Sequence, residues 1–217
     1  MQIIPAINCP DAACVKQRFS QIANIFSGSS DEQWVHIDIA DGSFTSGHAT
    51  WRTASELAIL VGEARPKIEA HLMLANSTSA IVDWLNVGVN RIIVHANSVF
   101  DLSDTIARCA SRQVEFTLAL SPDVNITQAS AMLDQVRSCL LLAVQPGLSG
   151  QRFDPATITK IRQVRADFPN LMIEVDGGIN LETARACAGS GAHRLAAASY
   201  IFEAPDPKTA YESLRVI

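Results

Sequence analysis

Eight short apolar runs, separated by longer mixed segments, constrain the fold of this chain more than any other feature. The runs are Ile3–Ile7, Trp34–Ile39, Ile68–Leu74, Arg91–Val94, Phe116–Leu120, Cys139–Val144, Leu171–Val175 and Arg194–Ala197. Most are rich in β-branched residues or Leu, as strands buried on both faces are. The intervening segments Ala12–Phe26 and Pro155–Phe168 carry apolar residues at helical spacing. Strands that alternate with helices predict βαβ units and a parallel sheet.

The polar residues beside these segments predict where three helices begin. Asp154 is expected to be an N-cap, followed by Pro155 at the first helical position. Asn76 and Asn180 are expected to cap the helices that follow the third and seventh strands.

Eight βα units account for residues 1–217, which favours a single (β/α)₈ TIM barrel domain. Eight is the number of strands that closes such a barrel. An open doubly wound sheet is the alternative, because its strands and helices also alternate. That fold favours a Gly-x-Gly-x-x-Gly turn after the first strand, and the segment 8–11 (NCPD) has no such pattern.

Composition excludes several classes of protein. The chain has 22 acidic and 17 basic residues, a net charge of −5, which argues against a nucleic-acid partner. The apolar share of 48% is enough for a folded core. The start Met1–Pro5 lacks the basic and apolar parts of a secretory signal, and runs such as Leu140–Val144 are too short to span a bilayer. We therefore expect a cytoplasmic protein without a membrane partner.

The cysteines follow no recognisable pairing pattern. Their number is odd and no CxxC pair occurs, so we expect all five to be reduced, buried thiols. They are Cys9, Cys14, Cys109, Cys139 and Cys187.

Histidines and carboxylates gather where the predicted strands end. In a TIM barrel the carboxyl ends of the strands carry the active site. His36 and Asp38 are two residues apart and so share one face of a strand, while His71 and Asp176 end the third and seventh strands. Two imidazoles and two carboxylates suit a divalent metal such as Zn²⁺. Such carboxylates can also move a proton on either side of a carbon atom.

The alternative reading is that these side chains are hydrogen-bonded structural residues. We expect His48, His95 and His193 to be such structural residues. This reading is weaker for the four residues above, because burying several such groups without partners costs several kcal/mol each.

Small, Gly-rich turns follow the last three strands and favour a phosphate site. Backbone N–H groups in such turns can converge on a phosphate, and barrels often bind one near strands seven and eight. The turn residues are Gly147, Leu148, Ser149, Gly150, Gly177, Gly178, Ala198 and Ser199.

Four motifs, in order along the chain, resemble the signatures of the ribulose-phosphate 3-epimerase family. They are 36–42 (HIDIADG), 70–73 (AHLM), 144–151 (VQPGLSGQ) and 174–179 (EVDGGI). The segments 5–7 (PAI) and 197–202 (AASYIF) lie in matching places near the two ends. The resemblance spans essentially the whole chain. It implies a TIM barrel of the ribulose-phosphate-binding type that interconverts D-ribulose 5-phosphate and D-xylulose 5-phosphate.

The resemblance also implies roles for individual residues. His36, Asp38, His71 and Asp176 would bind one divalent metal, Zn²⁺ first and Fe²⁺, Mn²⁺ or Co²⁺ as alternatives. Asp38 and Asp176 would be the acid/base pair acting through a metal-stabilised enediolate. Substrate contacts would come from Ala6, His71, Met73 and the eight turn residues. The implied substrate partner is a phosphorylated ketose. Family members commonly associate, so the resemblance is also compatible with a homo-oligomer.

Several substrate-recognition positions depart from the family pattern. Ala6 stands where the family usually has Ser, Ala40 and Leu142 replace methionines that cap the sugar, and Ala198 replaces a glycine of the phosphate turn. The four proposed metal ligands are kept. A hexulose phosphate or another phosphorylated ketose is therefore an alternative substrate.

Two other activities serve as alternatives. Related barrels that decarboxylate sugar-acid phosphates resemble this chain in fold, but they carry Asp-x-Lys-x-x-Asp on the second strand, and Ala40 replaces the lysine here. A non-catalytic sugar-phosphate-binding barrel would explain the altered recognition positions. It would not explain two opposed carboxylates among the proposed metal ligands.

Overall fold

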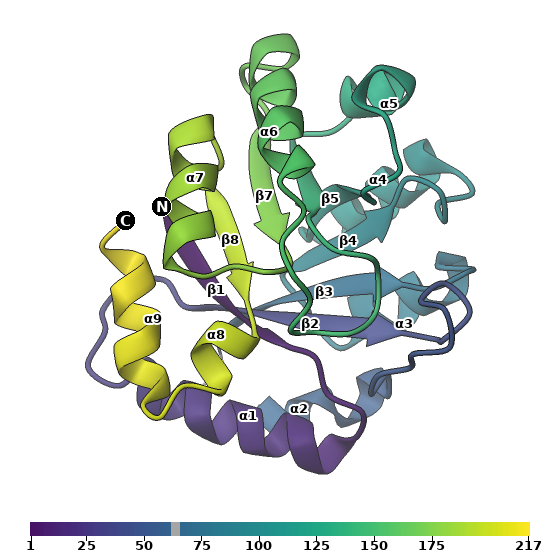
Figure 1. The fold of residues 1–217 in the computed structure, drawn as a ribbon. Coiled ribbons are helices and arrows are strands. Elements are labelled where there is room, and N and C mark those ends of the chain that lie inside the picture. The colour runs from purple at the N-terminus through teal and green to yellow at the C-terminus, as the bar shows by residue number, and fades with distance from the viewer. Residues whose placement is uncertain (62–65) are drawn as a thin grey trace.

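The computed structural model describes residues 1–61 and 66–217, and its strands close into a barrel (Figure 1). Each strand is parallel to its neighbour in chain order, and the last pairs with the first. The strands are β1 (Gln2–Ile7), β2 (Trp34–Ala40), β3 (Lys67–Met73), β4 (Arg91–His95), β5 (Glu115–Leu120), β6 (Ser138–Leu142), β7 (Met172–Asp176) and β8 (Arg194–Ala197). The predicted (β/α)₈ barrel is confirmed.

Helices surround this barrel, and the last of them packs against its first elements. They are α1 (Ala12–Ile25), the 3₁₀ turn η1 (Ala54–Glu56), α2 (Leu57–Val61), α3 (Thr78–Asn86), α4 (Leu102–Ser111), α5 (Ile126–Leu133), α6 (Ala156–Asp167), α7 (Leu181–Ser190), α8 (Ser199–Phe202) and α9 (Pro207–Arg215). Helix α9 contacts both α1 and β1, so the C-terminal end of the chain lies beside the first strand (Figure 1).

The predicted elements agree with the observed ones to within one or two residues. Each apolar run forms a strand, although β6 ends at Leu142 rather than Val144. Asn180 caps α7 as expected, in a capping box with Thr183. Two caps lie one residue later than predicted. Ser77, not Asn76, is the N-cap of α3, and Pro155, not Asp154, is that of α6, although each expected residue still accepts a hydrogen bond from a first-turn N–H.

Apolar side chains fill two separate regions. The larger core lies between the strands and the helices and includes the edge-to-face pair of Trp51 and Trp84, with ring centroids 5.8 Å apart. A smaller apolar cluster is formed by strand residues of β4, β5 and β6; its members are Ile93, Ala119, Leu140 and Leu142. Within residues 1–61 and 66–217, no helix has the length and apolarity needed to cross a membrane.

The expectation of five reduced thiols is wrong for two of them. Cys9 and Cys14 form a disulfide, with their Cα atoms 5.6 Å apart. Asp11 caps α1 by accepting the N–H of Cys14, and the resulting reversal of the chain brings the first turn of the helix back to the end of β1. A CxxxxC spacing does not reveal this approach. Cys109, Cys139 and Cys187 are free and buried, as predicted.

The barrel interior also buries a charged group, the guanidinium of Arg91. It forms ion pairs with Glu69 and, at 2.8 Å, with Glu115, and its Nη1 lies 3.6 Å from Glu174 Oε2. The guanidinium also stacks 4.0 Å from the ring centroid of Trp34. Arg91, Glu69 and Glu174 are fully buried, so the arginine offsets the charge of carboxylates that water does not reach.

Replacement of Arg91 tests this balance. We expect Arg91→Met to lower the free energy of unfolding by about 3–5 kcal/mol, because Glu69 would remain buried without its cation. Urea denaturation measures the change. Arg108→Met is the control, since its ion pair with Asp104 is exposed and its loss should cost about 0.3–0.5 kcal/mol. Equal losses in the two variants would contradict the account.

The turn that ends β7 requires glycine at two consecutive positions. Gly177 and Gly178 have φ values of +101° and +66°. A Cβ on Gly178 would lie 2.5 Å from the backbone nitrogen of Phe153, in the segment before α6. The turn after β7 and the loop after β6 are therefore in backbone contact.

Gly178→Ala should lower the free energy of unfolding by at least about 1–3 kcal/mol, because alanine combines a left-handed backbone with a clash against Phe153. Gly189→Ala is the matched control. Gly189 lies within α7 and a Cβ there meets no atom within 4 Å, so this change should stabilise the protein by about 0.5–1 kcal/mol. Urea denaturation of both variants decides the point, and a neutral Gly178→Ala would refute it.

Candidate active site

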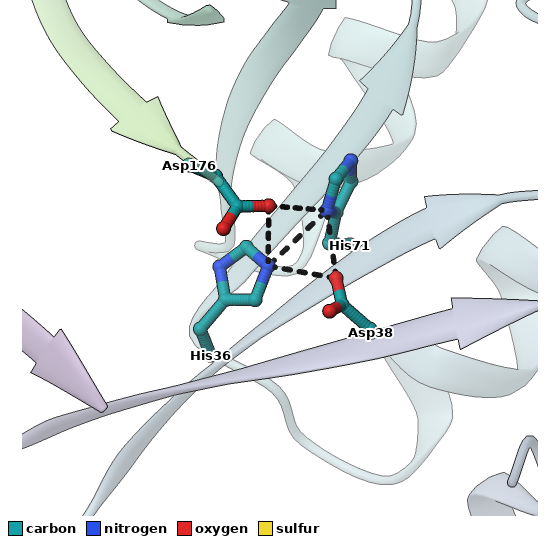
Figure 2. A group of neighbouring side chains, drawn as sticks. All are labelled: His36, Asp38, His71 and Asp176. Carbon is teal, nitrogen blue, oxygen red and sulfur yellow. Dashed lines mark hydrogen bonds and ion pairs between the residues drawn. The ribbon is translucent and has the colours of Figure 1, made fainter. Parts of the chain in front are cut away.

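Two histidines and two aspartates from three strands meet at the mouth of the barrel (Figure 2). His36 and Asp38 lie two residues apart on β2, and Asp38 is paired in register with His71 on β3. Asp176 is the last residue of β7 and approaches from across the barrel. One potential ligand atom from each side chain lies within 4.8 Å of the others, so the predicted quartet is assembled.

The two imidazoles lie between the two carboxylates. His36 Nε2 and His71 Nδ1 are 3.1 Å apart. Asp38 Oδ1 lies 3.2 Å and 3.0 Å from these two nitrogens, and Asp176 Oδ2 lies 3.9 Å and 3.7 Å from them. Figure 2 shows the carboxylates on opposite sides of the nitrogen pair. The two acids thus face a common space from different directions.

A carboxylate behind His36 engages one ring nitrogen and so turns the other nitrogen toward this space. His36 Nδ1 donates to Glu69 Oε1 at 2.7 Å. An ionised carboxylate can only accept, and the pKa of Glu69 is lowered to about 2 because hydrogen bonding by His36 and the charge of Arg91 outweigh its burial. With a metal bound, the proton held on Nδ1 would leave the lone pair of Nε2 free to ligate it.

A second chain of hydrogen bonds lies behind His71. Its Nε2 is 2.9 Å from His95 Nε2, and His95 Nδ1 is 2.9 Å from Ser121 Oγ. Burial lowers the pKa of His71 and, together with His71, holds the pKa of His95 well below its usual range. With a metal bound, a proton on His71 Nε2 donated to His95 would leave the lone pair of His71 Nδ1 free to ligate the cation.

With only the protein's own charges present, the two aspartates titrate in opposite directions. Burial disfavours ionised Asp38, but hydrogen bonds with His36 and His71 outweigh it and hold its pKa well below the usual value. Burial and the charge of Asp38 raise the pKa of Asp176 to about 7. One carboxyl that stays ionised thus faces one that can carry a proton near neutral pH.

This donor set fits a divalent cation. Burial opposes a charge on His36, yet hydrogen bonds to Asp38 and Glu69 and the nearby carboxylate of Glu174 raise its pKa well above the ordinary value. The same surplus of negative charge attracts a metal ion, which would take the place of that proton on Nε2. Two imidazole nitrogens and two carboxylate oxygens suit Zn²⁺ and its neighbours in the first transition series.

A cavity opens beside the quartet and contains most of the predicted contact residues. Asp38 and Asp176 line it together with Met73, Gly147, Leu148, Ser149, Gly150, Gly177, Gly178, Ala198 and Ser199. Ala6 does not line it and is 1% exposed. Ala40 is also fully buried away from the cavity, so neither small side chain enlarges it.

Several residues at or behind the site were not predicted from the sequence, among them Asn8, Glu69 and Glu174. Asn8 lines the cavity, and Glu69 and Glu174 lie behind His36. Each lies two residues before or after a predicted site residue on the same strand or its extension: Ala6, His71 and Asp176, respectively. The period of two that paired His36 with Asp38 applies equally to these residues.

Solved structures with the same fold are sugar-phosphate and related enzymes. A crystal structure of 3-hexulose-6-phosphate synthase superposes with a TM-score of 0.70 at 14% identity, covering 100% of this chain and 99% of that one. KGPDC from Streptococcus mutans in complex with D-R5P gives a TM-score of 0.73 at 15% identity, covering 99% and 95%. At such low identity these similarities show the fold alone.

Proteins related in sequence identify the family of this chain. The ribulose-phosphate 3-epimerase of Chlamydia muridarum (strain MoPn / Nigg) is 35% identical over 210 residues, 93% of this chain and 88% of that protein. The ribulose-phosphate 3-epimerase of Bacillus subtilis (strain 168) is 29% identical over 224 residues, 99% and 98% of the two chains. Residues 3–202 match the model of a protein family described as "Ribulose-phosphate 3 epimerase family". The chain therefore belongs to the ribulose-phosphate 3-epimerase family and is a sugar-phosphate isomerase.

Proposed function

We propose that this protein interconverts D-ribulose 5-phosphate and D-xylulose 5-phosphate by inverting carbon 3. The observation that supports this most is the pair of carboxylates, Asp38 and Asp176, on opposite sides of two imidazole nitrogens (Figure 2). Inversion at carbon needs a proton removed from one face and another delivered to the opposite face. A single acid/base group on one side could not do both.

Four residues would hold one divalent metal ion. Zn²⁺ is the ion we favour, and Fe²⁺, Mn²⁺ and Co²⁺ are the alternatives. They are His36, Asp38, His71 and Asp176. When bound, the cation supplies stabilisation of the negative charge that develops on the substrate oxygens beside carbon 3. Glu69 and His95 would keep the two imidazoles in the tautomers and orientations that ligation requires.

The two aspartates would carry the proton transfer. One carboxylate removes the proton from carbon 3, and the electron pair of that C–H bond shifts toward the C2 carbonyl to give an enediolate. The carboxyl group of the other aspartate then returns a proton to the opposite face of carbon 3. Each turnover leaves the first aspartate protonated and the second ionised, so proton exchange with solvent or the reverse reaction resets the pair.

The turns beside the cavity would bind the phosphate. Gly177, Gly178 and Ser199 lie at the carboxyl ends of β7 and β8, where backbone N–H groups can meet an anion. Met73 and Leu142 also line the cavity and would exclude water from the reacting carbon. Because Ala6 and Ala40 add no room there, a pentulose phosphate is favoured over a larger ketose phosphate.

Turnover of ribulose 5-phosphate tests the substrate and the metal together. We expect the chelator-treated protein to be inactive, because the cation stabilises the charge formed beside carbon 3, and we expect added Zn²⁺, Fe²⁺, Mn²⁺ or Co²⁺ to restore epimerisation. Xylulose 5-phosphate formation is the readout, with hexulose phosphates assayed in parallel. If the protein binds ribulose 5-phosphate but exchanges no substrate hydrogen with solvent, whichever metal is added, it is instead a non-catalytic sugar-phosphate-binding protein.

Substitution of the two aspartates tests the acid/base roles. Asp38→Asn and Asp176→Asn should each lower kcat by about 10²–10⁴-fold, because an amide cannot remove or return the proton. Circular dichroism checks that the fold is kept. Asp83→Asn, the same change at an exposed position of α3, should leave kcat unaltered. A fully active Asp38 or Asp176 variant would remove that residue from the mechanism.

A further inference from the structure

The side chain of Asn8 connects three elements at the barrel mouth. Asn8 follows β1, and its Nδ2 donates one hydrogen bond of 2.8 Å to Asp38 Oδ2 and another of 2.9 Å to the backbone carbonyl oxygen of Gly147. The first partner belongs to β2 and the second to the loop after β6. An amide nitrogen carries two hydrogens, so both donors of Asn8 are used.

The bond to Asp38 engages the oxygen that the histidines leave available. Asp38 Oδ1 faces His36 Nε2 and His71 Nδ1, whereas Asp38 Oδ2 accepts from Asn8. With partners on both oxygens, the carboxylate cannot rotate about its Cβ–Cγ bond without breaking contacts. The plane of this carboxylate, and therefore the direction of its lone pairs, is fixed in part by Asn8.

The second partner of Asn8 is itself held in place. Gly147 has a φ of +129°, and a Cβ there would lie 3.2 Å from both the Cβ and the carbonyl oxygen of Thr45. The backbone at Gly147 thus packs closely against the segment after β2. Its carbonyl gives Asn8 an anchor in the loop after β6, so the amide is held between two acceptors from different elements.

We propose that Asn8 is a positioning residue that orients the Asp38 carboxylate for ligation and for proton transfer at one face of the substrate. This inference rests on the proposed function, and it assigns a role to a side chain that touches Asp38 rather than to another acid or base. Ala6, two residues earlier on the same face of β1, offers no polar side-chain atom for this task.

Asn8→Leu removes both donors and is the main test variant. Its Zn²⁺ dissociation constant, measured by competition with a chelator, should rise about 10–100-fold, the usual result of losing a partner that orients a metal ligand. Asn97→Leu is the matched control, because Asn97 is exposed at the same end of the barrel. Its Zn²⁺ affinity should equal that of the wild type.

A stereochemical readout separates misorientation of Asp38 from a general loss of structure. In D₂O, the epimer deprotonated by Asp176 should exchange its carbon 3 hydrogen in the Asn8→Leu variant while conversion falls about 10–100-fold, because only delivery by Asp38 is impaired. The opposite epimer should lose exchange and conversion together. A general structural defect would slow both processes equally from both epimers.

Asn8→Asp provides a second variant of nearly identical shape. The ionised carboxylate cannot donate to Asp38 or to Gly147, so the same asymmetric exchange is expected even if Asn8→Leu folds poorly. Variants with wild-type Zn²⁺ affinity and symmetric exchange would overturn the role of Asn8. A wild type that binds Zn²⁺ but does not convert ribulose 5-phosphate would instead refute the proposed function, and the affinity comparison would still decide the role of Asn8.

Discussion

The hydrogen bond from His36 to Glu69 connects the chemistry at the barrel mouth to the packing inside the barrel. It keeps the proton on Nδ1 and so turns the other nitrogen toward Asp38 and His71. Glu69 remains ionised there because His36 hydrogen-bonds to it and Arg91 lies against it. The orientation of a proposed metal ligand therefore depends on a buried arginine at the opposite end of β4 from the mouth.

This arrangement gives the site a surplus of negative charge that the protein does not neutralise on its own. Asp38, Asp176, Glu69 and Glu174 are all buried, and burial together with the charge of Glu69 raises the pKa of Glu174 to about 7. Carboxyls in such surroundings must either take up protons or find a cation. The same electrostatics thus favour a divalent ion at the mouth and a proton-carrying carboxyl beside it. Affinity for the metal and capacity for acid/base chemistry have a common origin.

Much of the fold and of the site was predictable because both follow from periodicity. Buried parallel strands have continuous apolar runs, and each of the eight runs became a strand. The spacing of His36 and Asp38 placed both on one face, and barrel closure brought His71 and Asp176 to them. Residues of the predicted phosphate turns, such as Gly178 and Ser199, line the cavity because the loops after parallel strands open at one end of a barrel.

The features that sequence reasoning missed depend on how side chains meet across elements. Glu69 and Glu174 share faces with predicted site residues, but nothing in the sequence says that a carboxylate at such a position will point at an imidazole. The segment after β1 is the clearest case. A reversal of the chain capped by Asp11 joins Cys9 to Cys14 and holds the end of β1 close to the mouth, where Asn8 reaches both Asp38 and Gly147. Such contacts join residues 30 and 139 positions apart, and no local pattern encodes them.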